Sequence, residues 1–205
     1  MTVVGKIHSG SVFRRRVRVL SQHLCDLLPH GAQVLDVGCG DGSLDSLLLK
    51  ARPDVTIRGT DVLLRPETHI PVAEFDGERI PYQDSTFDVV LLVDVLHHTV
   101  DPLALLREAR RVSRCWIVVK DHTKDGLLAA PTLRFMDWFG NAHHGVVLPY
   151  NYLTEAEWRQ GFDGLDLNVE KWVANVGLYP WPASHFFDRS LHFVARLVKG
   201  RCARS

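Results

Sequence analysis

The fold is decided by the stretch Val34-Leu35-Asp36-Val37-Gly38-Cys39-Gly40-Asp41-Gly42, in which a short apolar run ends in an acid and three alternating glycines. Residues without a Cβ atom let the chain turn sharply and let a ligand lie against main-chain amides. Ser43 then opens a helical pattern of apolar residues, and the free N–H groups of that helix point toward the same place. A tight turn without a ligand needs fewer glycines. The stretch therefore predicts a strand, a ligand-binding loop and a helix.

Two nucleotide cofactors suit such a loop. The dinucleotide fingerprint Gly-x-Gly-x-x-Gly is not fulfilled, because Ser43 stands where the third glycine is required. The chain instead reads acid-x-Gly-x-Gly-x-Gly, which resembles the first motif of the class I S-adenosylmethionine (SAM) dependent methyltransferases. A second β-rich run, 55–59, leads to Asp61, about 20 residues past the glycines, where a carboxylate can accept hydrogen bonds from ribose hydroxyls. This acid suits either cofactor.

Later segments favour SAM. Residues 75–82 and 84–90 resemble the third and fourth motifs of that family, and residues 94–102 resemble the segment after its fourth strand. The resemblance covers residues 30 to 120 and carries these motifs in order, which makes a chance origin improbable. It implies SAM as the cofactor. It also implies cofactor contacts from Asp36, Gly38, Cys39, Gly40, Asp61, Val62, Asp76, Gly77, Val93 and His98, with Asp76 accepting the adenine amino group.

Length and periodicity predict one α/β domain over residues 1–205. The expected architecture is a Rossmann-like sandwich, with a mostly parallel seven-stranded sheet, an antiparallel strand near its edge and helices on both faces. Its expected parts are an N-terminal helical segment (1–30), a SAM-binding half (31–120), a substrate-side insertion or lid (121–153), and a C-terminal helix and strand hairpin (154–198).

Helix caps and apolar runs place the individual elements. Apolar residues recur at helical spacing from Phe13 to Leu27. Asp101 is a natural N-cap, and Thr154 to Glu157 forms a capping box. Residues 115–119 read as a fifth strand, and residues 169–174 and 191–197 as an antiparallel pair.

Composition excludes several classes of protein. Lys+Arg and Asp+Glu both number 24, so no bulk nucleic-acid binding is expected, and the basic run 14–18 is interpreted as a solvated helix face. The four cysteines form no Cys-x-x-Cys pair, which predicts a reducing compartment and no zinc site. Residues 1–10 lack the apolar core of a signal peptide, and the run 89–93 is too short to span a bilayer. We therefore expect a cytoplasmic protein, whose oligomeric state is left open.

The segment 127–139 is unusually apolar. It either packs on the sheet as ordinary core or forms a wall for an apolar substrate, and both can hold at once. Ligand sites in open α/β sheets lie beyond the carboxyl ends of the strands, and this segment follows the fifth strand. The predicted substrate contacts are Phe135, Trp138 and Tyr150.

Histidines are the candidate catalytic bases. Methyl transfer needs an aligned nucleophile, and an oxygen or nitrogen acceptor that starts protonated also needs a base with a pKa near neutrality. His122, at the tip of the fifth strand, is the first choice, oriented by Asp121 or His144; His97 is the next. Strand alternation would place the side chains of Asp121 and His122 on opposite sides of the sheet. A metal held by two histidines and a carboxylate is not predicted, because no His-x-x-x-His spacing occurs.

The sequence thus predicts a SAM-dependent methyltransferase acting on an oxygen or nitrogen of a small, partly apolar acceptor. Carbon methylation of the quinone-biosynthesis type, which needs no strong base, is the alternative within the family. A nicotinamide-dependent oxidoreductase is disfavoured by Ser43 and by Asp76-Gly77. A non-catalytic SAM-binding partner stays open, because the family has no universal catalytic residue.

Overall fold

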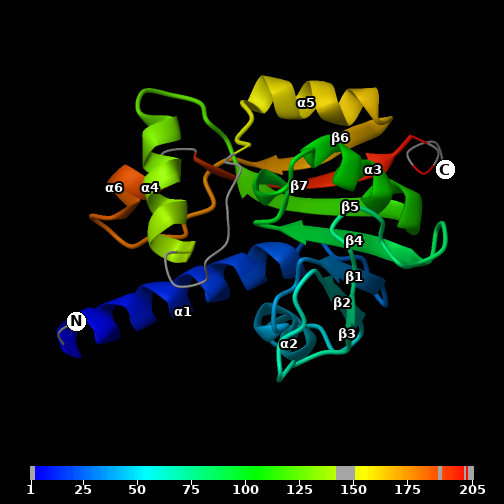
Figure 1. The fold of residues 1–205 in the computed structure, drawn as a ribbon, viewed down its shortest axis with the longest axis horizontal. Coiled ribbons are helices and arrows are strands. Elements are labelled where there is room, and N and C mark those ends of the chain that lie inside the picture. Colours follow the sequence, from blue (N-terminus) through cyan, green and yellow to red (C-terminus); the bar gives the residue numbers. More distant parts are fainter. Residues whose placement is uncertain (1–2, 142–150, 189–190, 201, 203–205) are drawn as a thin grey trace.

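A computed structural model describes residues 3–141, 151–188, 191–200 and 202, with side chains from residue 14 onward except at 137–141. These residues form one seven-stranded sheet in the order β3-β2-β1-β4-β5-β7-β6 (Figure 1). Strand β7 runs antiparallel to β5 and β6, and the other pairs are parallel, which confirms the predicted fold class. The strands are β1 (Gln33–Val37), β2 (Thr56–Asp61), β3 (Val72–Glu74), β4 (Phe87–Val93), β5 (Ser113–His122), β6 (Leu167–Val173) and β7 (His192–Lys199).

Helices cover both faces of the sheet. Buried residues of α1 and α2 pack on one face, and those of α3 and α5 pack on the other. None of the helices in the described ranges combines the length and hydropathy that a membrane span needs. The helices are α1 (Val3–Cys25), α2 (Ser43–Ala51), the 3₁₀ turn η1 (Leu96–His98), α3 (Pro102–Val112), α4 (Ala129–Asn141), α5 (Glu155–Gly164) and α6 (Ser184–Phe187).

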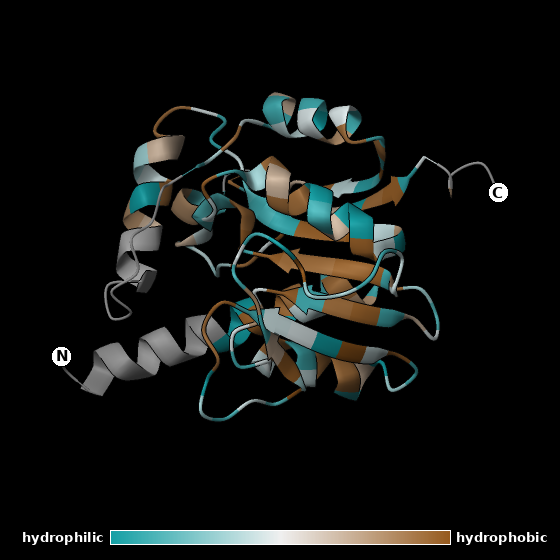
Figure 2. Cartoon of the chain, turned by 45° about the vertical axis from the view of Figure 1, so that its right-hand side comes forward, coloured by the Kyte–Doolittle hydropathy of each residue, from teal (hydrophilic) through white to brown (hydrophobic). Residues whose placement is uncertain are grey.

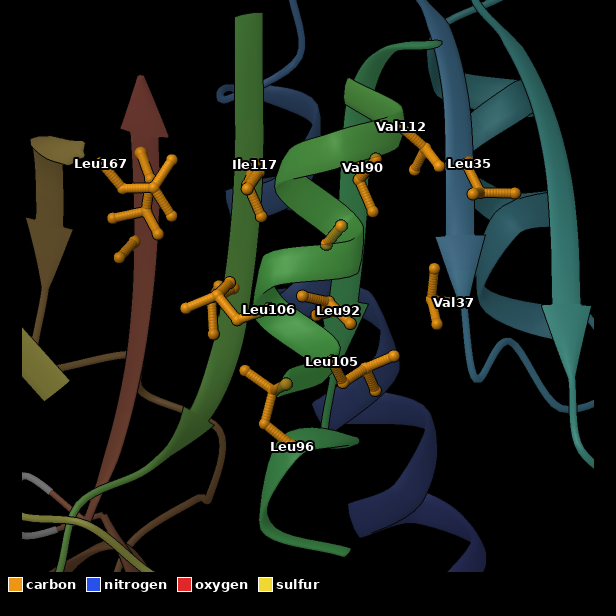
Figure 3. Close-up of a cluster of buried hydrophobic side chains, with 14 of the residues drawn as sticks. Leu35, Val37, Val90, Leu92, Leu96, Leu105, Leu106, Val112, Ile117 and Leu167 are labelled. Carbon is orange, nitrogen blue, oxygen red and sulfur yellow. The ribbon is translucent and has the colours of Figure 1, made fainter. Parts of the chain in front are cut away.

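The core follows from the apolar character of the central strands. Leu105 and Leu106 of α3 lie over β4 and β5, against a cluster that includes Leu35 and Ile117 (Figure 3). Hydrophobic residues dominate these strands, whereas the outward sides of the helices are largely hydrophilic (Figure 2). Because both faces of the central strands are buried, their sequences are apolar without alternation.

Two predicted helix caps are confirmed. The side chain of Asp101 accepts hydrogen bonds from the backbone N–H groups of Leu103 and Ala104, both at 3.0 Å. Thr154 and Glu157 form the reciprocal bonds of a capping box at the start of α5. These bonds satisfy N–H groups that have no partner within the helix, and so they fix where α3 and α5 begin.

Other elements differ from the sequence predictions. Helix α1 begins at Val3, ten residues before the predicted apolar pattern, and the short edge strand β3 was not located from the sequence. Helix α4 stands beyond one end of the sheet, beside α6 (Figure 1). Its buried residues Ala129 and Leu133 do not join the sheet core. They form a small separate cluster with Tyr152 and Leu191.

The cysteines also differ from the prediction. Cys115 and Cys202 form a disulfide with their Cα atoms 5.6 Å apart, whereas Cys25 and Cys39 are free. A disulfide is rare in the reducing compartment that the sequence predicts, so this pair does not agree with that expectation. Two cysteines that are separated by 87 positions and meet only in the fold leave no local spacing pattern in the sequence.

Candidate active site

The glycine loop connects β1 to α2 at the carboxyl end of the sheet. Gly38, Gly40 and Gly42 all have positive φ angles, of 76°, 61° and 75°. A Cβ atom on Gly38 would lie 2.5 Å from the side chain of Val95, and one on Gly42 would lie 2.5 Å from that of Ile70. No described atom lies within 4 Å of the position of a Cβ on Gly40. Two of the glycines therefore serve close packing, and Gly40 faces open space.

Asp61, at the end of β2, binds this loop directly. One carboxylate oxygen accepts the N–H of Gly40 at 2.8 Å, and the other accepts the N–H of Leu63 at 2.9 Å. A carboxylate oxygen has two lone pairs, so Asp61 can hold the loop and still accept hydrogen bonds from a ligand's hydroxyl groups.

Asp76 lies in the loop after β3 and is exposed. Its side chain accepts the backbone N–H groups of Glu78 and Arg79 at 2.8 and 2.7 Å. These bonds, led by that from Arg79, lower the pKa of Asp76 below its usual range. Gly77 follows with a φ of 85°, where a side chain would be strained. The Asp76 carboxylate is therefore charged at neutral pH and can accept further hydrogen bonds.

The other predicted cofactor contacts lie at the same end of the sheet, on β1 and its loop, after β2, and at the end of β4. Cys39, Val93 and His98 are half-buried, Asp36 is buried and Val62 is exposed. Burial is the main cause that raises the pKa of the Cys39 thiol, with further contributions from neighbouring carboxylates. Cys39 is thus an uncharged thiol at neutral pH.

A cluster of buried ionisable side chains lies where β4 and β5 end. At its centre is Asp121, which is 0% exposed. Its carboxylate pairs with His97 Nδ1 at 2.6 Å and accepts the backbone N–H groups of Leu96 at 3.1 Å and His122 at 2.8 Å. Burial by itself would raise the pKa of Asp121, but His97 and His122 outweigh it and hold that pKa well below its usual value. Asp121 is therefore a carboxylate that fixes His97.

A second acid of the cluster is Asp94, which follows β4 and is only half-buried. Its backbone has a φ of 56°, a left-handed conformation that is rare for residues other than glycine and common at functional sites. Its side chain forms an ion pair with fully buried Lys120, and one of its oxygens lies 3.7 Å from His122 Nδ1. Burial opposes ionisation of Asp94, but the charge of Lys120 outweighs it and lowers the pKa.

His192 of β7 completes the cluster. Its Nδ1 lies 3.5 Å from Lys120 Nζ, and its Nε2 lies 3.0 Å from the carbonyl oxygen of Phe187. The rings of His192 and His122 have their centroids 4.8 Å apart. Burial, followed by the charge of Lys120, lowers the pKa of both histidines. Both rings are therefore neutral at neutral pH.

The structure corrects two predictions about His122. Its ring is almost completely buried, as is that of His97, although His122 stands at the tip of the fifth strand. Asp121 and His122 also do not separate to opposite sides, since the Asp121 carboxylate lies 3.4 Å from His122 Nδ1. Alternation fails here because Asp121 turns back to accept the N–H of the next residue, at the point where β5 ends.

The predicted substrate contacts are placed only in part. Phe135 lies on α4 and is 54% exposed, and Leu127 and Leu128, which precede this helix, are exposed as well. Trp138 also belongs to α4, but its side chain lies outside the described part of the chain. Tyr150, His143 and His144 lie outside the described residues, so their roles stay predictions.

Sequence reasoning missed four residues of the buried cluster: Asp94, Lys120, His192 and Tyr152. The Tyr152 ring stacks near that of His97, with centroids 5.7 Å apart. Two of the four carried a signal, because an acid directly after an apolar strand and a lysine within one both require a buried partner. His192 and Tyr152 carried none, because they meet the cluster from distant parts of the chain.

Comparison with known proteins shows which family the chain resembles. A family model described as a methyltransferase domain matches residues 12–171. The chain is 35% identical over 96 residues to a ubiquinone biosynthesis O-methyltransferase of Cereibacter sphaeroides, covering 40% of this chain and 37% of that protein. It is 28% identical over 110 residues to the 27-O-demethylrifamycin SV methyltransferase of Amycolatopsis mediterranei, covering 46% of this chain and 40% of that protein. It is 29% identical over 145 residues to a ubiquinone/menaquinone biosynthesis C-methyltransferase of Cupriavidus metallidurans, covering 62% and 60%. The match thus spans 37% to 60% of these relatives.

Solved structures agree in fold. The chain superposes with a TM-score of 0.66 and 16% identity on a protein from the complex with the Haloferax volcanii Trm112 methyltransferase activator, covering 93% of this chain and 94% of that one. A SAM-dependent methyltransferase from Mesorhizobium loti gives a TM-score of 0.64 at 17% identity, covering 87% and 96%. At these identities the likeness concerns the fold alone.

Proposed function

Because this chain belongs to the methyltransferase domain family, we propose that it transfers a methyl group to an oxygen or nitrogen of a small, partly apolar acceptor, with a histidine as base. SAM, the cofactor of this family, supplies the methyl group on a positively charged sulfur. The loop at Gly40 and the carboxylates of Asp61 and Asp76 are the proposed cofactor contacts. The buried cluster at the ends of β4 and β5 is the proposed place of proton transfer.

The observation that supports a base is the pair between His97 and Asp121. A carboxylate that binds Nδ1 of a histidine fixes the ring and its tautomer, so Nε2 becomes the atom that takes a proton. Asp121 is itself fixed by two backbone N–H groups, and its negative charge would stabilise His97 once protonated. We therefore assign the role of base to His97 and that of positioning residue to Asp121.

His122 is the second candidate for the base. Its Nδ1 lies farther from Asp121, at 3.4 Å, and burial with the nearby charge of Lys120 lowers its pKa. A buried ammonium group disfavours a proton on a neighbouring histidine, whereas Nδ1 of His97 lies only 2.6 Å from the Asp121 carboxylate. The geometry thus favours His97 over His122, which reverses the order expected from the sequence.

The residues fit the proton balance of such a reaction. On this proposal His97 Nε2 would take the proton of the acceptor's hydroxyl or amino group, and the acceptor's oxygen or nitrogen would receive the methyl group that SAM would supply from its sulfur. Alignment by the surrounding side chains contributes to the rate, because holding two reactants in line removes much of the entropic barrier. Exposed Phe135 on α4 supports an acceptor with an apolar body.

A metal-dependent mechanism is the main competitor. Asp94, His97 and His122 offer ligand atoms that all lie within 4.8 Å of one another, and two histidines with a carboxylate suit several divalent metals. The sequence offered such a ligand set but no His-x-x-x-His spacing to support it, and here the ligand atoms come from the ends of two strands. However, Lys120 already supplies a cation to Asp94, and Asp121 holds His97. A divalent ion would have to compete with Lys120, so we propose the base without a metal.

Carbon methylation is the second candidate function, favoured by the match to a quinone C-methyltransferase. An activated carbon acceptor requires no strong base, so the pair of His97 and Asp121 would then serve stability alone. The two functions differ in how their rates respond to the loss of His97.

The test first identifies an acceptor by incubating a metabolite extract with methyl-labelled SAM. Turnover is then measured for His97→Ala, His122→Ala and Asp121→Asn, and calorimetry with S-adenosylhomocysteine serves as the control for cofactor binding. We expect His97→Ala to lower turnover by roughly 10²- to 10⁴-fold at unchanged cofactor affinity, and His122→Ala to lower it less. Turnover of His97→Ala within a few-fold of the unmodified protein would refute the base. Loss of activity in EDTA, restored by a divalent ion, would instead establish a metal.

A further inference from the structure

A second group of buried acids lies under the glycine loop, away from the proposed base. Asp36, at the end of β1, is 3% exposed, and Asp45, in the first turn of α2, is 0% exposed. Carboxyl groups are among the least frequently buried side chains, and burial normally requires a hydrogen-bonding partner or a counter-ion.

Most of the carboxyl oxygens of this pair lack such a partner among the described residues. Both carboxyl oxygens of Asp45 and one of Asp36 are buried without a hydrogen-bond donor. The two side chains lie close enough to share a hydrogen bond with each other. Two carboxyl groups can share one only if one of them carries a proton, because an ionised carboxylate has no donor.

The charged groups around this pair are also acidic. Asp61 of β2 acts on Asp36, and Asp41 of the loop acts on Asp45. The charge of His69 acts on Asp41 rather than on the buried pair. Burial, with these neighbours, raises the pKa of Asp36 well above its usual value and that of Asp45 to about 7. Within the described chain the pair therefore lacks a cation and has an environment suited to one.

We propose that Asp36 and Asp45 hold one shared proton in the cofactor-free protein and release it to solvent when the α-ammonium group of the cofactor binds beside them. The inference rests on the assignment of SAM as the cofactor. The ammonium charge replaces that of the departing proton, so the net charge of the site stays the same. The sulfonium group is the other cation of SAM, but its methyl group must face the acceptor. The proposed base belongs to the buried cluster at the ends of β4 and β5, so the methyl group of the sulfonium must point there. The pair of Asp36 and Asp45 lies at β1 and α2 instead, which leaves the ammonium group as the cation for the pair.

Calorimetry tests the release directly. S-adenosylhomocysteine, which carries the ammonium group but no sulfonium, is titrated into the full chain in two buffers of different ionisation enthalpy, at several pH values. We expect about one proton released per ligand near pH 6 and a fall toward zero above pH 8, with affinity rising up to about tenfold per pH unit at the acid end. Methylthioadenosine, a neutral ligand without the amino acid part, should release none.

Two variants locate the proton. Asp45→Asn keeps the shape of the side chain and can donate permanently to Asp36, so it should bind S-adenosylhomocysteine with no proton release. Asp41→Asn is the matched control, because Asp41 is an exposed acid of the same loop, and it should keep the release. If Asp45→Asn does not fold, proton release by the unmodified protein with S-adenosylhomocysteine and with methylthioadenosine still tests the inference.

Three results would overturn the inference: binding of S-adenosylhomocysteine without proton release, equal release with methylthioadenosine, or release that persists in Asp45→Asn. Each leaves the cofactor assignment intact. A failure of S-adenosylhomocysteine to bind at any pH would instead overturn the cofactor assignment, and the inference with it.

Discussion

Substituting alanine for Gly40 and for Gly42 should separate ligand binding from folding. Both residues have positive φ, so an alanine at either position carries a backbone strain of about 1 to 2 kcal/mol. At Gly40 nothing further is added, because no described atom lies within 4 Å of the new Cβ. At Gly42 the Cβ would lie 2.5 Å from the buried side chain of Ile70 and 3.3 Å from the backbone nitrogen of the same residue.

The two variants should therefore differ in stability. Overpacking of this kind costs typically about 1 to 3 kcal/mol, so Gly42→Ala should lose about 2 to 5 kcal/mol of unfolding free energy, and Gly40→Ala about 1 to 2. Gly38→Ala should behave like Gly42→Ala, because its Cβ meets Val95 at 2.5 Å. Urea denaturation measures each value from the transition midpoint and slope.

Cofactor affinity should be weakened more by Gly40→Ala than by Gly42→Ala, the reverse of the order expected for stability. A Cβ on Gly40 would occupy the open space beside the loop, so we expect Gly40→Ala to weaken S-adenosylhomocysteine binding at least about tenfold, the equivalent of about 1.4 kcal/mol. The affinity of Gly40→Ala is measured by calorimetry under conditions where the protein is fully folded. Normal affinity in Gly40→Ala, or a greater loss of stability there than in Gly42→Ala, would refute the assignment of Gly40 to the ligand.

Three further predictions concern Asp61, Asp101 and Asp45. Asp61→Ala should weaken S-adenosylhomocysteine binding by about 1.5 to 3 kcal/mol in calorimetry, because a charged hydrogen-bond acceptor is lost and the N–H of Gly40 loses its partner; an unchanged dissociation constant would remove Asp61 from the site. Asp101→Ala should lower the unfolding free energy by about 0.5 to 2 kcal/mol through the lost cap, and Asp101→Asn should restore most of it; a shift in cofactor affinity would contradict a purely structural role. The pKa of Asp45 is raised from 3.8 to about 7, so between these values the folded protein binds more protons than the unfolded chain, and stability should fall as pH rises from about 4 to about 7, by up to about 4 kcal/mol. Urea denaturation of cofactor-free Asp45→Asn should lack this fall, and an identical pH dependence in both proteins would exclude Asp45 as its source.

Much of the fold was predictable because its signals are local. The glycine loop, the Asp101 cap and the Thr154 capping box depend on residues within a few positions of each other, and all three lie where the sequence placed them. The antiparallel pairing of β6 and β7 was also predicted from their β-rich sequences, although the segment that connects them contains α6 and is longer than a hairpin turn. Strand β3 has only three residues and therefore carries too short a pattern.

The candidate site was predictable only where its residues follow a strand directly. His97, Asp121 and His122 were singled out because each lies just after or at the end of a buried strand, but their mutual distances depend on how β4 and β5 pair. His192 joins them because β7 returns antiparallel beside β5, with His122 opposite His192 in the register. A sequence pattern does not state which strand becomes the neighbour of which, so this contact could not be anticipated.

The apolar stretch of α4 shows a different limit. Its composition suited a helix packed on the sheet, but the helix stands at the end of the sheet with Phe135 exposed. Apolar composition indicates that a surface avoids water, and it does not indicate whether another part of the chain or a ligand covers it.

The position of the transferred methyl group tests the proposed function most directly. The full chain is incubated with SAM that carries a ¹³C-labelled methyl group and with the acceptor found in the extract, and the product is examined by NMR and mass spectrometry. The account predicts that the label is bonded to oxygen or nitrogen, that one exchangeable hydrogen of the acceptor is lost, and that His97→Ala forms this product at least about a hundredfold more slowly. A label bonded to carbon, or formation of the same product at an undiminished rate by His97→Ala, would contradict it.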